Sequence, residues 1–203
     1  MADGDRTILL VRHGETEWNR IGRWQGATDI PLSDVGREQA RVLAERLLGQ
    51  PIRRVVASHL SRARETAEII AATLKLQAPV SLDPRLRERG YGCFEGLTRE
   101  ECAELHPGAW ERYLADRRAV PPDAEPQDEV IARFTAAMEG VARDADPGGL
   151  SLVISHGGSI RSFVHAAVGA LLPPLGNGAI VRLAFGDGRF ALADEIGVTE
   201  KSR

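Results

Sequence analysis

Two short apolar segments, residues 7–11 and 150–154, are each followed one residue later by a histidine and a glycine. A continuous apolar run of this length is typical of a parallel strand that is buried on both faces. Parallel strands end at one edge of their sheet, where α/β proteins bind ligands. We therefore expect His13 and His156 to lie at the same edge of one sheet.

Amphipathic helices are expected between the strands. Helices are predicted at residues 33–48, with Gly49 as the C-cap, and at 61–74, and strands are predicted at 54–57 and 79–82. Two later helices are predicted from apolar faces, one made of Val130, Phe134, Ala137, Met138 and Val141 and the other of Ile160, Phe163, Val164 and Ala167. A hairpin around Gly186-Asp187-Gly188 is predicted to close the chain. Strands that alternate with helices predict a three-layer α/β/α sandwich around a mostly parallel sheet.

The segment from about residue 83 to 126 has the least regular pattern. Thr98 to Glu101 fits a capping box and predicts a short helix, whereas the prolines at 121–126 break the chain. We interpret the segment as a cap on a single domain that spans residues 1–203, a length that can bury a core without disulfides or metal.

Composition limits the partners and the compartment. Hydrophobic residues at 43% and charged residues at 27% are typical of a soluble enzyme, and a net charge of −3 argues against nucleic acid or an anionic membrane as partner. Cys93 and Cys102 lack the spacing of a zinc site or redox pair. Arg12 interrupts the first apolar run, which excludes a signal peptide or membrane span there. These features predict a cytoplasmic protein.

Arg12-His13-Gly14 carries residues suited to phosphoryl transfer. Neutral imidazole is a nucleophile toward phosphorus, and a covalent phosphohistidine divides one difficult step into two. The arginine can bind phosphate oxygens, and the glycine lets backbone N–H groups approach an anion. On its own, the tripeptide also fits a polar strand end.

Ser155-His156-Gly157-Gly158 repeats this pattern at the start of a helix. Helix N-termini attract anions through their free N–H groups and dipole. Glycines that merely allow the chain to bend are the alternative. Because the pattern occurs twice, we favour convergence of both histidines on one phosphate.

Several motifs, in order along nearly the whole chain, resemble those of one family. They are Leu10-Val11-Arg12-His13-Gly14-Glu15-Thr16, Trp18-Asn19, Gly22-Arg23-Trp24-Gln25-Gly26, Leu32-Ser33-Asp34-Val35-Gly36, Ala57-Ser58-His59-Leu60-Ser61-Arg62-Ala63, Leu86-Arg87-Glu88, Gly92-Cys93-Phe94-Glu95-Gly96 and Ser155-His156-Gly157-Gly158. The chain thereby resembles the histidine phosphatase superfamily, which includes cofactor-dependent phosphoglycerate mutases and many small phosphatases. The resemblance implies a phosphoglycerate mutase-like fold.

The resemblance also implies a role for each matching residue. His13 matches the nucleophile of the family. Glu88 matches the residue that donates a proton to the leaving oxygen and later activates water as a base. Arg12, Arg62 and His156 match the pocket that holds the transferring phosphoryl group. Substrate or phosphate contacts are implied for Asn19, Gln25, Gly26, Arg89, Tyr91, Arg99, Gly157 and Asn177, and no metal is implied. From the residues alone, Glu88 also fits a surface partner of Arg85 or Arg89, and Arg62 fits a helix cap.

The choice between phosphatase and mutase rests on a few positions. Glu88-Arg89-Gly90-Tyr91-Gly92, Arg99 and Arg117-Arg118 before a proline pair resemble the mutases. Thr16, Gln25-Gly26, Phe94-Glu95-Gly96 and Gly158 resemble the phosphatases, although the chain has Asp123-Ala124-Glu125-Pro126 where these commonly carry Gly-Gly-Glu-Ser.

We predict a phosphomonoester hydrolase that acts on a small anionic phosphorylated metabolite and needs no cofactor. A phosphoglycerate mutase primed by 2,3-bisphosphoglycerate is the alternative, and a non-catalytic phospho-ligand-binding protein is a remote one. A metallohydrolase lacks support because no His-Glu-x-x-His or Cys-x-x-Cys spacing is present. Relatives suggest a homodimer.

Overall fold

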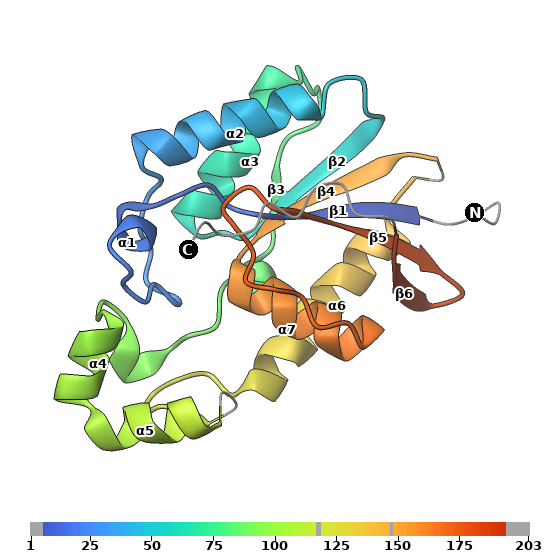
Figure 1. The fold of residues 1–203 in the computed structure, drawn as a ribbon. Coiled ribbons are helices and arrows are strands. Elements are labelled where there is room, and N and C mark those ends of the chain that lie inside the picture. Colours follow the sequence, from blue (N-terminus) through green and yellow to red (C-terminus); the bar gives the residue numbers. More distant parts are fainter. Residues whose placement is uncertain (1–5, 117–118, 147, 194–203) are drawn as a thin grey trace.

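A six-stranded sheet forms the centre of the computed structural model, which describes residues 6–116, 119–146 and 148–193 (Figure 1). The strands follow the order β3-β2-β4-β1-β5-β6 across the sheet. They are β1 (Arg6–Arg12), β2 (Ile52–Ala57), β3 (Ser81–Leu82), β4 (Leu150–Ser155), β5 (Ile180–Gly186) and β6 (Arg189–Leu192).

The sheet is mostly parallel, as predicted. β1, β2, β3 and β4 pair in parallel, whereas β5 runs antiparallel to β1 and β6. β1 and β4 are adjacent, and Arg12 pairs with Ser155 at their carboxyl ends. The predicted closing hairpin joins β5 to β6, and Asp187 and Gly188 in its turn have φ of 49° and 72°, the left-handed values that a tight hairpin favours.

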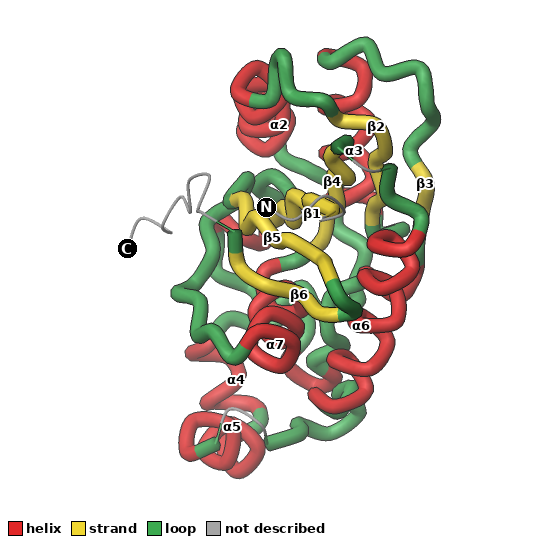
Figure 2. Tube along the Cα trace, turned by 90° about the vertical axis from the view of Figure 1, so that its right-hand side faces the viewer, coloured by secondary structure: helices red, strands yellow, loops and turns green. Residues whose placement is uncertain are grey.

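Helices cover both faces of the sheet and give the predicted three layers (Figure 2). α2 (Asp34–Arg46) and α3 (Ser61–Thr73) pack on one face with Leu9 and Val11. α6 (Gln127–Arg143) and α7 (Gly157–Val168) pack on the other face, which carries Ile8 and Leu10. The alternate residues of β1 therefore supply both cores, which explains why the strand reads as a continuous apolar run.

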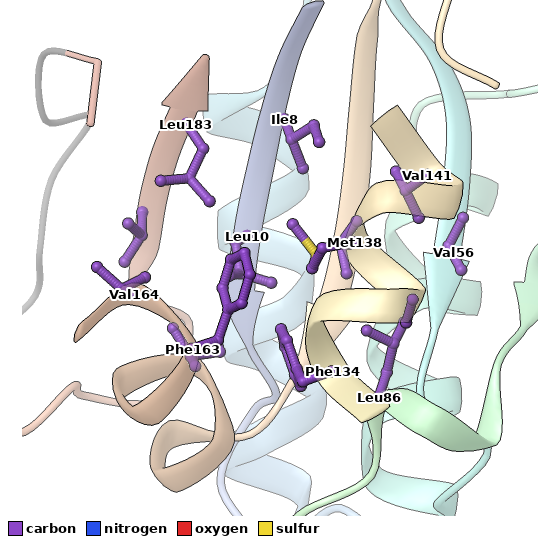
Figure 3. Packing of buried hydrophobic residues seen from close by; sticks show 14 of the residues in the cluster. Ile8, Leu10, Val56, Leu86, Phe134, Met138, Val141, Phe163, Val164 and Leu183 are labelled. Atoms are coloured by element: carbon purple, nitrogen blue, oxygen red, sulfur yellow. The ribbon is translucent and has the colours of Figure 1, made fainter. Parts of the chain in front are cut away.

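The larger core lies between the sheet and α6 and α7. Figure 3 shows Phe134 and Met138 of α6 with Phe163 of α7 in this cluster, beside Leu10 of β1. The rings of Phe134 and Phe163 lie 5.2 Å apart between centroids. Replacing either phenylalanine by alanine would cost about 3–5 kcal/mol of stability. This packing fixes the start of α7, where His156 lies.

The cap segment is more regular than we expected from its sequence. It contains two 3₁₀ turns, η1 (Pro84–Leu86) and η2 (Gly92–Phe94), and two helices, α4 (Arg99–Leu105) and α5 (Pro107–Ala115). The capping box from Thr98 to Glu101 is confirmed at the start of α4. A third apolar cluster holds the cap together, and its buried members are Phe94, Cys102, Trp110 and Tyr113. Packing of these mostly aromatic side chains gives the cap its order, although its sequence has no long amphipathic pattern.

Several predicted boundaries were wrong by a few residues. α2 begins after its N-cap Ser33 and ends at Arg46, with Leu47 rather than Gly49 at the C-cap. β3 contains only two residues, and β2 begins at Ile52 because that side chain also enters the core. The short helix α1 (Glu17–Arg20) was not predicted. In the part of the chain that the structure describes, no helix has the length and apolar character needed to cross a membrane.

Candidate active site

His13 and His156 meet at the carboxyl edge of the sheet, where β1 and β4 end side by side. The centroids of their rings lie 5.1 Å apart. The backbone N–H of His13 donates to the carbonyl of Ser155 over 2.9 Å, which extends the pairing of the strands to the loop. Both side chains are buried, at 3% and 0% exposed. The predicted convergence of the two histidine segments is confirmed by this arrangement.

The tautomer of His13 follows from a close polar contact of its ring. Its Nδ1 lies 2.6 Å from the backbone oxygen of Gly14, which can only accept a hydrogen bond, so Nδ1 carries the proton. Burial first, and then the charges of Arg62 and Arg12, lower the pKa of His13 well below its ordinary value. The ring is therefore neutral at physiological pH, and its Nε2 keeps a free lone pair, as a nucleophile requires.

His156 is the N-cap residue of α7. Burial, followed by the charge of Arg62, also lowers the pKa of His156 well below its ordinary value. Both of its ring nitrogens are buried without a hydrogen-bond partner among the described residues. A neutral imidazole in this state has one donor and one acceptor available to a ligand.

Arg62 and Arg12 supply positive charge beside the two histidines. Arg62 is 1% exposed and donates to the carbonyls of Thr28 and Gly26, each over 2.8 Å. Burial lowers its pKa to about 10, so its guanidinium still carries a full charge at neutral pH. Arg12 donates to the carbonyl of Leu175. The alternative in which Arg62 caps its helix at the surface is wrong, because its side chain is fully buried.

Unpaired polar atoms gather in this region. Among the described residues, buried side-chain atoms without a hydrogen-bond partner are Arg12 Nε, Gln25 Oε1, Arg62 Nε, Arg89 Nη2, both His156 nitrogens and Arg182 Nε. All of them except Arg182 belong to positions that the sequence predicts for the site. Buried polar groups are ordinarily paired, so a cluster of unpaired ones, most of them N–H donors, indicates a site that can bind an anion.

Glu88 approaches the start of α7 with its carboxylate. Its Oε1 accepts from the N–H groups of Arg89 and Ser159 over 2.9 and 2.8 Å, and lies 2.8 Å from Ser159 Oγ. Its Oε2 accepts from the N–H of Gly158 over 2.9 Å. Glu88 is only 9% exposed, so the alternative of a surface ion pair with Arg85 or Arg89 is wrong. The anion that these N–H groups bind is this carboxylate, whereas we had expected a phosphate.

The loop after His13 packs tightly against the start of α2. A Cβ on Gly14 would lie 2.4 Å from the backbone oxygen of Gly36, so no larger residue fits there. The N–H of Gly14 donates to Thr66 Oγ1 over 3.1 Å. We expected the glycine to let backbone N–H groups approach an anion, but the N–H of Gly14 itself is bound by Thr66, and close backbone contact is the reason for glycine here.

Asn19 and Asn177 join the loop to the start of β5. Nδ2 of Asn177 donates to the backbone oxygen of His13 over 3.1 Å and to Oδ1 of Asn19 over 3.2 Å. Oδ1 of Asn19 also accepts from the N–H of Thr16. Both residues lie at the site as predicted, and these contacts brace the loop that carries His13.

Gln25 and Gly26 are held in place by Glu95. The Glu95 carboxylate accepts from the N–H groups of Ala27, Thr28 and Tyr91 over 2.9, 3.0 and 2.8 Å. A Cβ on Gly26 would lie 2.0 Å from Glu95 Oε1, and its φ of 53° also favours glycine. Glu95 and Arg62 thus fix the 25–28 turn beside the two histidines.

The remaining predicted site residues differ in position. Arg89 is 6% exposed and lies over the ring of Tyr91, with 5.6 Å from Cζ to the ring centroid. A Cβ on Gly157 would lie 3.3 Å from Arg12 Cδ, which places that residue at the site. Arg99 is exposed at the first turn of α4. Arg117 and Arg118, the pair that resembled the mutases, lie outside the described residues.

Reasoning from sequence missed three residues that organise the site, Ser159, Thr66 and Glu95. Ser159 and Glu95 bind carboxylate or N–H partners that lie about 70 residues away in the chain. Glu95 stands inside a motif that we compared with the family, whereas Ser159 directly follows one and Thr66 lies three residues beyond another. This proximity was the signal that could have identified them. No group of three or more His, Cys, Asp or Glu side chains suited to a metal ion occurs among the described residues.

Known proteins resemble the chain in sequence and in fold. A family model for the histidine phosphatase superfamily (branch 1) matches residues 8–195. The chain is 42% identical over 164 residues to phosphoglycerate mutase-like protein 4 of Arabidopsis thaliana, which covers 79% of this chain and 70% of that protein. It is 35% identical over 191 residues to a glucosyl-3-phosphoglycerate phosphatase of Mycolicibacterium vanbaalenii, covering 88% and 84%. The solved structure of a mycobacterial glucosyl-3-phosphoglycerate phosphatase with VO3 superposes with a TM-score of 0.82 at 29% identity, over 93% of this chain and 97% of that one.

Proposed function

The chain belongs to branch 1 of the histidine phosphatase superfamily, and we propose that it hydrolyses phosphomonoesters of a small anionic metabolite through a phosphohistidine on His13. The observation that carries this proposal is the neutral His13, with a free Nε2, among unpaired buried donors of Arg12, Arg62 and His156. Such donors meet the negative charge that develops on the three equatorial oxygens of a transferring phosphoryl group.

In the first step, Nε2 of His13 attacks phosphorus and the bond from phosphorus to the leaving oxygen breaks. Glu88 gives a proton to that oxygen, and the leaving group departs as an alcohol. We assign the proton to Oε2. Oε1 already accepts from the N–H groups of Arg89 and Ser159 and lies beside the Ser159 hydroxyl, whereas among the described residues Oε2 accepts only from the N–H of Gly158.

In the second step, a water molecule attacks the phosphohistidine. The Glu88 carboxylate takes a proton from this water, the bond from phosphorus to Nε2 breaks, and inorganic phosphate forms. Arg62 and Arg12 remain charged throughout, and their positions are set by the backbone carbonyls that they bind. The site thus needs little reorganisation between the two steps.

The proposal includes no metal and no cofactor for hydrolysis, since the nucleophile and the acid are both side chains of the chain itself. We place the reaction in the cytoplasm, which suits the free thiols of Cys93 and Cys102. Turnover that persists in the presence of a strong chelator would support the metal-independent mechanism. Sedimentation equilibrium tests the homodimer that its relatives suggest.

A phosphoglycerate mutase is the second candidate. The buried Arg89 with its unpaired Nη2 favours it, because such a cation can bind the carboxylate of a phosphoglycerate, and one relative is named mutase-like. A mutase would pass the phosphoryl group from His13 to a second hydroxyl of the bound acid, with 2,3-bisphosphoglycerate as the primer.

One experiment separates the two candidates. The purified protein is incubated with 3-phosphoglycerate and a trace of 2,3-bisphosphoglycerate, and inorganic phosphate and 2-phosphoglycerate are followed together, with His13→Ala as control. Phosphate release without isomerisation supports the hydrolase. Dominant 2-phosphoglycerate would assign the mutase, and absence of turnover here and on a panel of phosphomonoesters would refute both.

A further inference from the structure

A network of partly buried charges joins helix α6 to the chain segment that carries Glu88. At its centre, the side chain of Glu125 is 10% exposed and forms ion pairs with Arg133 and Arg87. Burial alone would raise the pKa of Glu125, but hydrogen bonds from Arg133 and Arg87 outweigh it and lower the pKa. The carboxylate is therefore charged and fixed between two guanidinium groups.

Arg133 uses all five of its N–H donors in this network. Two of them form a fork on the Glu125 carboxylate, from Nε over 2.7 Å and from Nη2 over 3.0 Å. The other three reach backbone oxygens, those of Arg85 and Arg87 from Nη1 over 2.6 and 2.8 Å and that of Glu88 from Nη2 over 3.2 Å. Lysine cannot reproduce this pattern, because its ammonium group has only three N–H donors and all of them are on one nitrogen.

The backbone of residues 85–88 is consequently held at every carbonyl. Ser155 Oγ donates to the one oxygen that Arg133 does not reach, that of Leu86, over 2.8 Å. Leu86 is itself fully buried in the larger core. The backbone at Glu88 is thereby fixed, and its carboxylate is bound at the start of α7.

The network also reaches the residues that follow Glu88. The N–H of Gly90 lies 3.3 Å from Glu125 Oε2, and the N–H of Glu125 donates to the carbonyl of Gly90 over 2.9 Å. Arg89 Nε donates to the backbone oxygen of Glu125 over 2.8 Å. Glu125 and Arg133 thus contact the residues that precede Glu88 and those that follow it in the chain.

Stability alone does not account for so many charges at one place. Buried ion pairs often contribute no more to stability than apolar residues of similar size, because each charge loses its hydration. Their fixed geometry is the property that an apolar replacement would lack. We propose that Arg133, oriented by Glu125, is a positioning residue that places the Glu88 carboxylate for proton transfer to the leaving group, an inference that rests on the proposed function.

This role predicts a dependence on the leaving group. kcat/KM reports the steps up to the first irreversible one, in which Glu88 protonates the leaving oxygen. A leaving group that is stable as an anion, as in p-nitrophenyl phosphate, needs little protonation. Phenyl phosphate needs more, and the alkoxide of glycerol phosphate needs most. A displaced Glu88 therefore lowers kcat/KM unequally across this series.

The variants are Arg133→Lys and Glu125→Gln, both of which retain side chains of similar length. Lysine also keeps a positive charge near His156, whose pKa is lowered by burial, Arg62 and other groups that include Arg133. Arg143→Lys is the matched control, since Arg143 lies on the same helix in an exposed ion pair with Glu139. Ser159→Ala, which removes a direct hydrogen bond to Glu88, is the positive control.

We expect both variants to lose roughly 10- to 100-fold in kcat/KM on glycerol phosphate, less on phenyl phosphate, and under about threefold on p-nitrophenyl phosphate. Ser159→Ala should show the same unequal loss, and Arg143→Lys should match the wild type on all three. Thermal melting measures any loss of fold, and Glu125→Gln carries the test if Arg133→Lys does not fold.

The possible results separate the inference from the proposed function. Equal losses on all three substrates, or wild-type behaviour of the variants, would overturn the positioning role and leave the hydrolase intact. A wild-type protein that turns over none of the three substrates and acquires no label on His13 would overturn the proposed function and the inference together.

Discussion

The backbone oxygen of Gly14 lies 2.6 Å from Nδ1 of His13, and this contact decides which ring nitrogen of His13 is free. Gly14 is in turn fixed by its close approach to Gly36 and by the hydrogen bond that its N–H donates to Thr66 Oγ1. The loop geometry therefore determines the tautomer of His13, and the tautomer determines that Nε2 carries the lone pair that attacks phosphorus.

The first prediction is a covalent phosphohistidine on this residue. Brief reaction with ³²P-labelled substrate followed by quenching should leave label that is lost in acid and stable in base, as expected for phosphorus bound to an imidazole nitrogen. His13→Ala should not acquire label and should lose roughly a thousand-fold or more in turnover. Label that maps to His156 would contradict the assignment.

The second prediction concerns stability against pH. Burial, together with neighbouring arginines, lowers the pKa values of His13 and His156 well below 6.5 in the folded protein. Below pH 6.5 the unfolded chain therefore binds more protons than the folded one, so the free energy of unfolding falls as the pH is lowered. At one pH unit below 6.5, each histidine that stays neutral in the folded protein should lower the free energy of unfolding by about 1 kcal/mol.

Urea unfolding between pH 8 and 5.5 measures this effect, because most carboxylates titrate below that range. Replacing both histidines by asparagine should flatten the dependence. Should the double variant lose stability on acidification as steeply as the wild type, other groups would have to be its source.

The framework of the site could be predicted from the sequence because its signals are local. The strand before His13 ends within a few residues of an arginine and a glycine, and the same pattern recurs at His156. Burial on both faces explains the continuous apolar run, and the adjacency of β1 and β4 brings the two ends together. The apolar runs and the two His-Gly pairs can be recognised without knowledge of distant contacts, whereas the pairing of β1 with β4 is known only from the structure.

The contacts that orient Glu88 could not be predicted in this way. Two of the three N–H groups that bind its carboxylate belong to residues 70 and 71 positions later in the chain. Arg133 lies on the polar side of a helix, where periodicity alone suggests an exposed position, yet its side chain is 14% exposed. Only the folded chain shows that its donors meet the backbone of residues 85–88.

A third prediction tests the close approach of Glu88 to α7. A Cβ on Gly158 would lie 2.8 Å from both Glu88 Oε1 and the Tyr91 hydroxyl, so alanine at this position must displace one of them. We expect Gly158→Ala to lower kcat/KM by about tenfold or more, because a shift of the proton donor of about 1 Å suffices. The measurement is steady-state turnover of phenyl phosphate together with thermal melting.

Gly108→Ala is the control for this prediction. Gly108 lies in α5, and a Cβ there would meet only the flexible end of Arg112, at 3.7 Å. Activity should remain at the wild-type level, since the cap helix retains its packing. If Gly158→Ala also retained full activity, the observed contact between Glu88 and α7 would not matter for catalysis.

The last prediction concerns the substrate. Arg89 is almost completely buried, its Nη2 has no partner among the described residues, and it follows the proton donor directly in the chain. A charged hydrogen bond contributes about 1.5–3 kcal/mol, so Arg89→Gln should raise KM roughly 10- to 100-fold for a substrate whose carboxylate it binds. Michaelis constants for 3-phosphoglycerate and p-nitrophenyl phosphate measure this, since only the first carries a carboxylate. Arg41→Gln is the control, because Arg41 lies exposed on α2 in an ion pair with Glu38 and should leave both constants unchanged. An equal rise for both substrates in Arg89→Gln would show that the arginine supports the site as a whole and does not select an acidic metabolite.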